Sequence, residues 1–125
     1  MNEEIHVSSL GKTWIFDIDG TLCKHNGYKI DGYDTILPGV CDFFTQLSDN
    51  DRVILITSRK KEYAQITEAF LHDNNLRYDA ILYEMPYGER ILINDKKPSG
   101  LITGIVVNTE RDVFMQQKFV VDSEL

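Results

Sequence analysis

Two aspartates one residue apart, Asp17 and Asp19, are the residues best suited to chemistry in this chain. They follow the apolar run that begins at Trp14, and a Gly-Thr pair comes directly after them. In an extended strand, side chains two residues apart point to the same face. Two carboxylates that close repel each other unless a cation lies between them. The spacing therefore predicts a cation site at the end of a strand.

The elements that must position this pair alternate between strand and helix signals. Strands are predicted at 13–17, 53–56, 80–82, 91–93 and 105–107, with helices at 40–47 and 62–71. The segment from Lys24 to Leu37 has no clear period and reads as a loop or small hairpin, and Glu110-Arg111-Asp112 as a solvated turn. Alternating strands and helices are typical of a mostly parallel α/β sheet.

Polar residues follow three of the predicted strands. Asp17 and Asp19 end the first, Thr57-Ser58 follow the second, and Asn94-Asp95 follow the fourth. In open α/β sheets ligands bind outside the carboxyl ends of the strands. The sequence therefore predicts one site built from these three positions.

The run Asp17-Ile18-Asp19-Gly20-Thr21 resembles the first motif of the haloacid-dehalogenase-like (HAD) phosphatase superfamily. Thr57 lies where that family has its second motif, and Ile93-Asn94-Asp95 lies where it has its acidic fourth motif. The resemblance covers residues 13–108. It implies a three-layer Rossmann-like fold whose mostly parallel, five-stranded sheet has the order 5-4-1-2-3.

The resemblance also implies roles for these residues. Asp17 is expected to attack phosphorus and form an aspartyl-phosphate, and Asp19 to act as general acid and then as base. Asp17, the Asp19 backbone carbonyl and Asp95 are expected to hold Mg²⁺, which prefers oxygen ligands. Thr57 and Ser58 are expected to bind the phosphoryl group, although they would equally suit the N-cap of the following helix.

Two departures from the family pattern stand out. Asn94 occupies the place of an acid before Asp95, so either residue could be the direct metal ligand. The lysine of the family's third motif has no counterpart in its usual segment. Lys97 is the first candidate to supply that positive charge, and Arg59 is the second, because each follows the carboxyl end of a predicted strand.

Size and charge limit the other possibilities. The chain has 125 residues, a net charge of −7 and two cysteines, Cys23 and Cys41. We expect a single catalytic domain over residues 1–125, and a cytoplasmic location, since neither a signal peptide nor an apolar span is apparent. Acidity argues against broad nucleic-acid or membrane surfaces. The resemblance implies a small phosphorylated substrate, and the acidity adds the expectation of no nucleic-acid or membrane partner.

Neither gap between the motifs is long enough for a cap domain, so the chain resembles a capless member of the family. Such a site is either open to large substrates or closed by a second subunit, which makes a homo-oligomer a reasonable hypothesis. The leading prediction is a Mg²⁺-dependent phosphomonoester hydrolase acting on a sugar phosphate or a related metabolite. The alternative is a non-catalytic HAD-like module that binds a metal, a phosphate or a partner. A receiver domain is set aside. That class needs an aspartate at the end of the apolar strand that follows the first acidic pair, and Thr57 occupies this position.

Overall fold

The computed structural model describes residues 3–125, which form two compact units. One unit comprises Gly11–Pro86 and Thr109–Met115 and carries the Asp17 motif. The other comprises residues 3–10 with Tyr87–Asn108 and Gln116–Leu125. Both contain parallel strands in open sheets, so the predicted α/β class with parallel pairing is confirmed. That the whole chain is one domain stays a prediction.

The motif-bearing unit is built on a three-stranded parallel sheet with the order β2-β3-β4. Its strands are β2 (Thr13–Asp17), β3 (Arg52–Ile56) and β4 (Ala80–Leu82). Their apolar runs match the predicted first three strands almost residue for residue. Asp17 is in register with Ile56, and Ile56 with Leu82, so the three strands end together at one edge.

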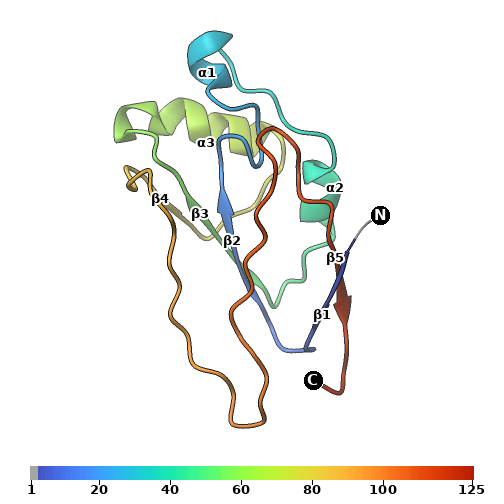
Figure 1. Cartoon of the computed structure of the whole chain (residues 1–125). Coiled ribbons are helices and arrows are strands. Elements are labelled where there is room, and N and C mark those ends of the chain that lie inside the picture. Colours follow the sequence, from blue (N-terminus) through green and yellow to red (C-terminus); the bar gives the residue numbers. More distant parts are fainter. Residues whose placement is uncertain (1–2) are drawn as a thin grey trace. The chain divides into compact units, whose positions relative to one another are not determined.

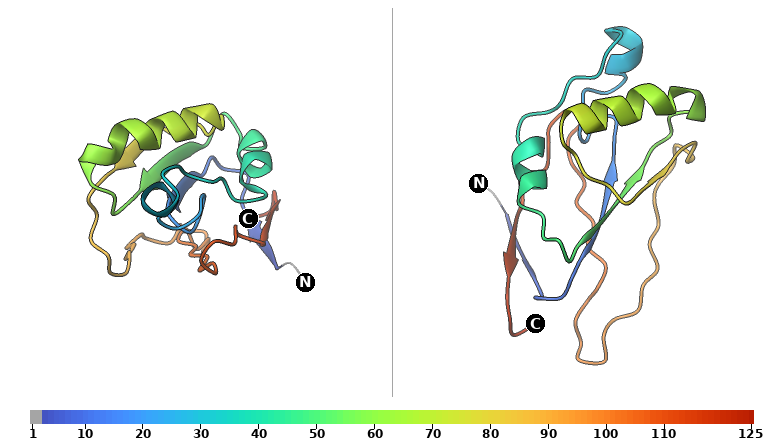
Figure 2. Two further views of the ribbon diagram at one scale, coloured as in Figure 1. Left: turned by 90° about the horizontal axis from the view of Figure 1, so that it is seen from above. Right: turned by 180° about the vertical axis from the view of Figure 1, so that it is seen from behind.

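Two helices cover one face of this sheet, as both views in Figure 2 show. They are α2 (Val40–Thr45) and α3 (Ala64–Asp73), and the 3-10 turn η1 (Lys61–Tyr63) leads into α3. Each buries an i, i+4 pair, Val40 with Phe44 and Thr67 with Leu71, as expected for a helix with one apolar stripe. Val40, Phe44 and Leu71 share one hydrophobic core with Phe16, Val53 and Leu55 of the sheet.

The segment between β2 and α2 runs beyond the carboxyl end of β2 (Figure 1). It carries the single-turn helix α1 (Gly27–Ile30). Backbone hydrogen bonds from Lys24 to the Thr35 carbonyl (2.9 Å) and from Leu37 to the Leu22 carbonyl (3.0 Å) tie its two ends together. The segment predicted as a loop or small hairpin is therefore a loop whose two ends are joined by backbone hydrogen bonds.

The second unit contains a two-stranded parallel sheet formed by β1 (Glu4–Val7) and β5 (Lys118–Val121). β1 was not predicted, although its Glu-Ile-His-Val run alternates polar and apolar side chains, because four residues are too few to identify a strand by period. β5 lies in the tail from Arg111 to Val121, whose sequence pattern is ambiguous between helix and strand.

The prediction of one five-stranded sheet is wrong, because the described residues form sheets of two and three strands. The predicted strands at 91–93 and 105–107 lie in a region without regular secondary structure. Ile91 and Ile93 are 80% and 87% exposed. A short apolar run indicates hydrophobicity but does not specify which strand it pairs with. Without hydrogen bonds to a neighbouring strand, such a run does not form a stable strand. No helix among residues 3–125 is long and apolar enough to cross a membrane.

Candidate active site

Asp17 is the last residue of β2, and the chain leaves the strand immediately after it. The Ile18 carbonyl accepts hydrogen bonds from the backbone N–H groups of Thr21, Leu22 and Cys23, at 3.2, 2.9 and 3.3 Å. Gly20 takes a φ of +79°, a conformation that glycine adopts without strain. The Thr21 hydroxyl, Oγ1, donates to Asp17 Oδ2 at 3.3 Å. The tight turn therefore gives the two aspartates different surroundings.

Asp19 is bound by Arg59, whose guanidinium balances the charge of this carboxylate. Arg59 Nε donates to Asp19 Oδ2 and Nη2 to Oδ1, both at 2.9 Å, in a bidentate arrangement. The backbone N–H of Asn26 also donates to Asp19 Oδ1, at 3.3 Å. The spacing of Asp17 and Asp19 predicts a cation beside them. At Asp19 this cation is the guanidinium of Arg59.

Arg59 is 3% exposed and bridges Asp19 to a second carboxylate, Asp34. Its Nη1 donates to Asp34 Oδ2 at 3.0 Å and its Nη2 to Asp34 Oδ1 at 2.7 Å. Nη1 also donates to the Thr67 hydroxyl at 2.9 Å, and the Tyr28 ring lies 3.9 Å from the guanidinium carbon. All five N–H donors of the guanidinium therefore bind protein groups.

The charges around Arg59 shift two pKa values. Burial alone would lower the pKa of Arg59, but hydrogen bonds to Asp19 and Asp34 outweigh it and raise the pKa above its ordinary value. Burial, followed by the charges of Asp34 and Asp19, raises the pKa of the Cys23 thiol far above its usual range. Cys23 is therefore a neutral thiol near neutral pH.

Thr57 lies one residue beyond β3, next to the end of β2, as predicted. It is 1% exposed, and its hydroxyl accepts the backbone N–H of Arg59 at 3.0 Å. The hydroxyl proton can then point to another acceptor. Ser58 follows it and is partly exposed. The helix-cap alternative is not what the structure has, because Lys60 stands at the N-cap of η1 and no side chain caps it.

A segment far away in the sequence closes over the Asp17–Thr21 turn. The Asp112 N–H donates to the Gly20 carbonyl at 2.8 Å, and Asp112 Oδ1 accepts the His25 N–H at 2.7 Å. A Cβ placed on Gly20 would lie 3.2 Å from Cγ of the exposed Arg111. Arg111 and Asp112 were predicted as a solvated turn. They are a turn, but one that adds a cation beside the first motif, which no local pattern indicated.

Asp19, Cys23 and Asp34 offer three potential metal-ligating atoms within 4.8 Å of one another. The Arg59 guanidinium binds all three groups, with Nη2 3.7 Å from Cys23 Sγ, and the thiol is neutral. This group therefore does not suit a cation. Asp17 and the Asp19 carbonyl are hard oxygen donors of the kind that Mg²⁺ prefers, and they fit the predicted ion better.

The remaining predicted site residues, Asp95 and Lys97, belong to the other compact unit. Thr103 Oγ1 donates to the Asp95 carbonyl and accepts from Asn94 Nδ2, both at 2.6 Å. Lys97 begins a turn closed by hydrogen bonds to Gly100 and Leu101. The roles of Asp95 as metal ligand and of Lys97 as phosphate-binding cation stay predictions. Arg59, the second candidate for that cation, directs its donors to Asp19 and Asp34 instead.

Comparison with known proteins finds similarity in structure only. No family model matches the sequence, and no curated protein matches it either. Two solved chains are similar, described as "Structure of Pnkp1/Rnl/Hen1 complex" and "Structure of the Pnkp1/Rnl/Hen1 RNA repair complex". Both have a TM-score of 0.52, with 28% and 29% sequence identity over 68% and 69% of this chain. This chain spans about a third of their length, 32% and 30%.

This similarity corrects one prediction. A small-molecule substrate with no nucleic-acid partner was expected, largely from the net charge of −7. The similar chains belong instead to an RNA repair complex, so the partner prediction is wrong. Net charge describes the average surface and does not exclude a local site that binds one end of an anionic polymer.

Proposed function

We propose that this chain is a HAD-type phosphatase that hydrolyses a terminal phosphate monoester on RNA. The observation that carries the proposal is the parallel register of β2 and β3. It puts the Asp17 carboxylate and the Thr57 hydroxyl at the same edge of the sheet, next to the turn that holds Asp19. A nucleophile, a phosphate-binding hydroxyl and a second carboxylate are the groups that such a reaction needs.

In the proposed reaction, a carboxylate oxygen of Asp17 attacks phosphorus, and the bond to the RNA oxygen breaks. For this step Asp19 is in its protonated form, with one of its two hydrogen bonds from Arg59 given up, and it gives that proton to the leaving oxygen. Asp19 then accepts a proton from the water that attacks the aspartyl-phosphate, which releases inorganic phosphate and restores Asp17. Thr57 and Ser58 donate hydrogen bonds to the phosphoryl oxygens throughout.

Mg²⁺ is the cofactor that we propose for this site. Asp17 and the Asp19 carbonyl would hold it, since both are hard oxygen donors. When bound, the ion neutralises charge on the phosphoryl oxygens.

The RNA substrate and a protein partner are proposed from the similar chains of the repair complex. A capless site suits a polymer end, because residues 3–125 contain no large domain inserted between the motifs that would restrict access to it. The Tyr87–Asn108 segment has exposed apolar side chains, among them Tyr87 at 88% and Val106 at 72%. Large apolar side chains exposed along one segment are common at protein contacts, and we propose this segment as the contact with a partner chain. The predicted cytoplasmic location suits an RNA substrate.

The test is phosphate release from short oligoribonucleotides that carry a 5′ or a 3′ terminal phosphate, with and without Mg²⁺. We expect Mg²⁺-dependent release by the wild type and a loss of about a thousandfold or more in Asp17→Asn. Asp42→Asn, an exposed aspartate of α2, is the matched control and should behave as wild type. If no RNA end is hydrolysed, an aryl phosphate tests the chemistry alone. Failure on both would favour the non-catalytic binding module.

A further inference from the structure

Asp34 lies outside every motif that the sequence suggests, yet its carboxylate is among the most deeply buried charges in the described chain. Its side chain is 3% exposed, and both of its oxygens accept hydrogen bonds from Arg59. It comes from the segment between β2 and α2, which the Lys24–Thr35 and Leu22–Leu37 hydrogen bonds hold closed. A buried carboxylate in a loop costs free energy unless it is paired, and this one is paired with the cation that binds Asp19.

Asp34 fixes the plane of the Arg59 guanidinium. Arginine presents its five donors in a rigid planar fork, so two bonds to one carboxylate set the direction of the others. Asp34 holds one edge of the fork, Thr67 Oγ1 accepts beside it, and the Tyr28 ring lies over the fork at 3.9 Å. The remaining edge, Nε and Nη2, then meets Asp19 at 2.9 Å for both bonds.

The other hydrogen bond to the Asp19 carboxylate is weaker. The Asn26 backbone nitrogen lies 3.3 Å from Oδ1, just beyond the ordinary range for such bonds. The direction of the Asp19 side chain therefore depends mainly on Arg59, and that of Arg59 on Asp34.

We propose that Asp34 is a positioning residue: acting through Arg59, it holds the Asp19 carboxylate where it exchanges a proton with the reacting phosphate ester. This inference rests on the proposed phosphatase function. Asp34 touches neither substrate nor metal in this account. It orients Arg59, which in turn orients Asp19, in the way that hydrogen bonds outside the first contact layer orient ligands and bases in other sites.

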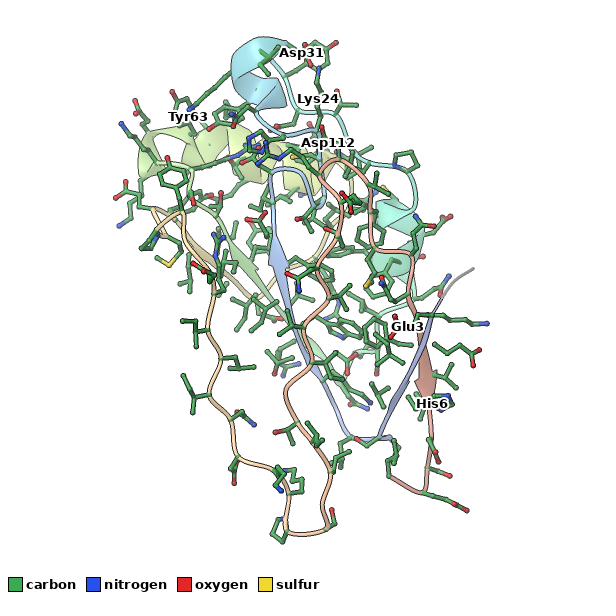
Figure 3. All side chains as sticks on the ribbon, viewed as in Figure 1. Glu3, His6, Lys24, Asp31, Tyr63 and Asp112 are labelled. Carbon is green, nitrogen blue, oxygen red and sulfur yellow. The ribbon has the colours of Figure 1, made fainter. Side chains whose placement is uncertain are left out.

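The experiment compares Asp34→Asn with Asp31→Asn. Asp31 is in the same segment, and its ion pair with Lys24 at 2.9 Å lies at the surface (Figure 3). On a phosphorylated oligoribonucleotide with Mg²⁺, we expect kcat of Asp34→Asn to fall about 10- to 100-fold with KM nearly unchanged. Asp31→Asn should keep the wild-type kcat. In an Asp19→Asn background, Asp34→Asn should cause no further loss, because its effect passes through Asp19.

A second readout does not require activity. Uniformly ¹⁵N-labelled protein should show the Nε–H and Nη–H signals of Arg59 separated and slow to exchange, as expected for a buried guanidinium with every donor bound. Asp34→Asn should broaden or shift these signals, and Asp31→Asn should leave them in place. Unchanged Arg59 signals in Asp34→Asn, or an Asp34→Asn effect that adds fully to that of Asp19→Asn, would overturn the inference. Failure of the proposed function is distinguishable, because it would appear as an inactive wild type.

Discussion

Removal of the Arg59 charge is expected to destabilise the fold strongly, and Arg59→Met is the variant that isolates this effect. Methionine fills similar apolar volume but leaves Asp19 and Asp34 facing each other without their shared cation. Four of the five donors that are lost reach carboxylates at 2.7 to 3.0 Å. Removing one partner of a buried ion pair costs about 3–5 kcal/mol, and Arg59 is 3% exposed, so solvent screens little of this.

The assay is urea unfolding at neutral pH, followed by circular dichroism, with the free energy of unfolding extrapolated to water. Adding Asp34→Asn to Arg59→Met should recover part of the loss, because it removes one of the two uncompensated buried charges. Lys24→Met breaks the surface ion pair with Asp31 and should change stability little. If Arg59→Met were as stable as Lys24→Met, the reasoning that this network is buried and mutually dependent would be refuted.

Three further predictions test other parts of the structure. Gly20→Ala should lower the free energy of unfolding by about 1–2 kcal/mol because of the positive φ, and by more because the new Cβ would lie 3.2 Å from Cγ of Arg111. Gly32→Ala, with a φ of +83° and open space around it, is the control that measures the backbone cost alone. Equal losses for the two variants in urea unfolding would contradict the role of the Arg111 contact. Cys23 should react with a maleimide far more slowly than the partly exposed Cys41, because burial raises the pKa of the Cys23 thiol, and mass spectrometry of the labelled peptides would expose a reversed order. The pKa of Cys23 in the folded state exceeds the unfolded value of 9.0, so the thiol of the unfolded chain ionises first as pH rises. The free energy of unfolding should therefore fall above about pH 9, by about 1.4 kcal/mol per pH unit for this group. Cys23→Ala should show a shallower decline in the same titration.

The strands of the motif-bearing sheet could be predicted because their apolar runs are bounded by turn residues and contain β-branched and aromatic side chains. The same reasoning failed at 91–93 and 105–107, where apolar content alone does not create a pairing partner. It also misassigned one face of α3. The apolar residues of the predicted helix 62–71 favour an inward face of Tyr63, Ile66, Ala69 and Phe70, whereas Ile66 is 48% exposed and Thr67 is fully buried. Thr67 is buried because its hydroxyl binds Arg59 and the Tyr63 carbonyl, a polar role that a hydrophobic count does not detect.

The candidate site was predictable where residues adjoin strand ends, and not where contacts are made over long distances. Asp17, Asp19 and Thr57 follow apolar strands, so topology alone places them at one edge. Asp34 and Asp112 reach the site from irregular segments whose paths depend on tertiary packing. Arg59 was noted only as a candidate phosphate-binding cation. Its actual partners became visible only with both carboxylates in place.

The central claim is that Asp17 is the nucleophile in phosphoryl transfer, and label transfer tests it most directly. An oligoribonucleotide with a ³²P-labelled terminal phosphate would be mixed with excess protein and Mg²⁺ and quenched in acid within the first turnover, and the label would be mapped by peptide analysis. We expect transient ³²P on the peptide that contains Asp17, and none on Asp17→Asn. Phosphate release without protein-bound label at any quench time, or label that persists in Asp17→Asn, would contradict the account.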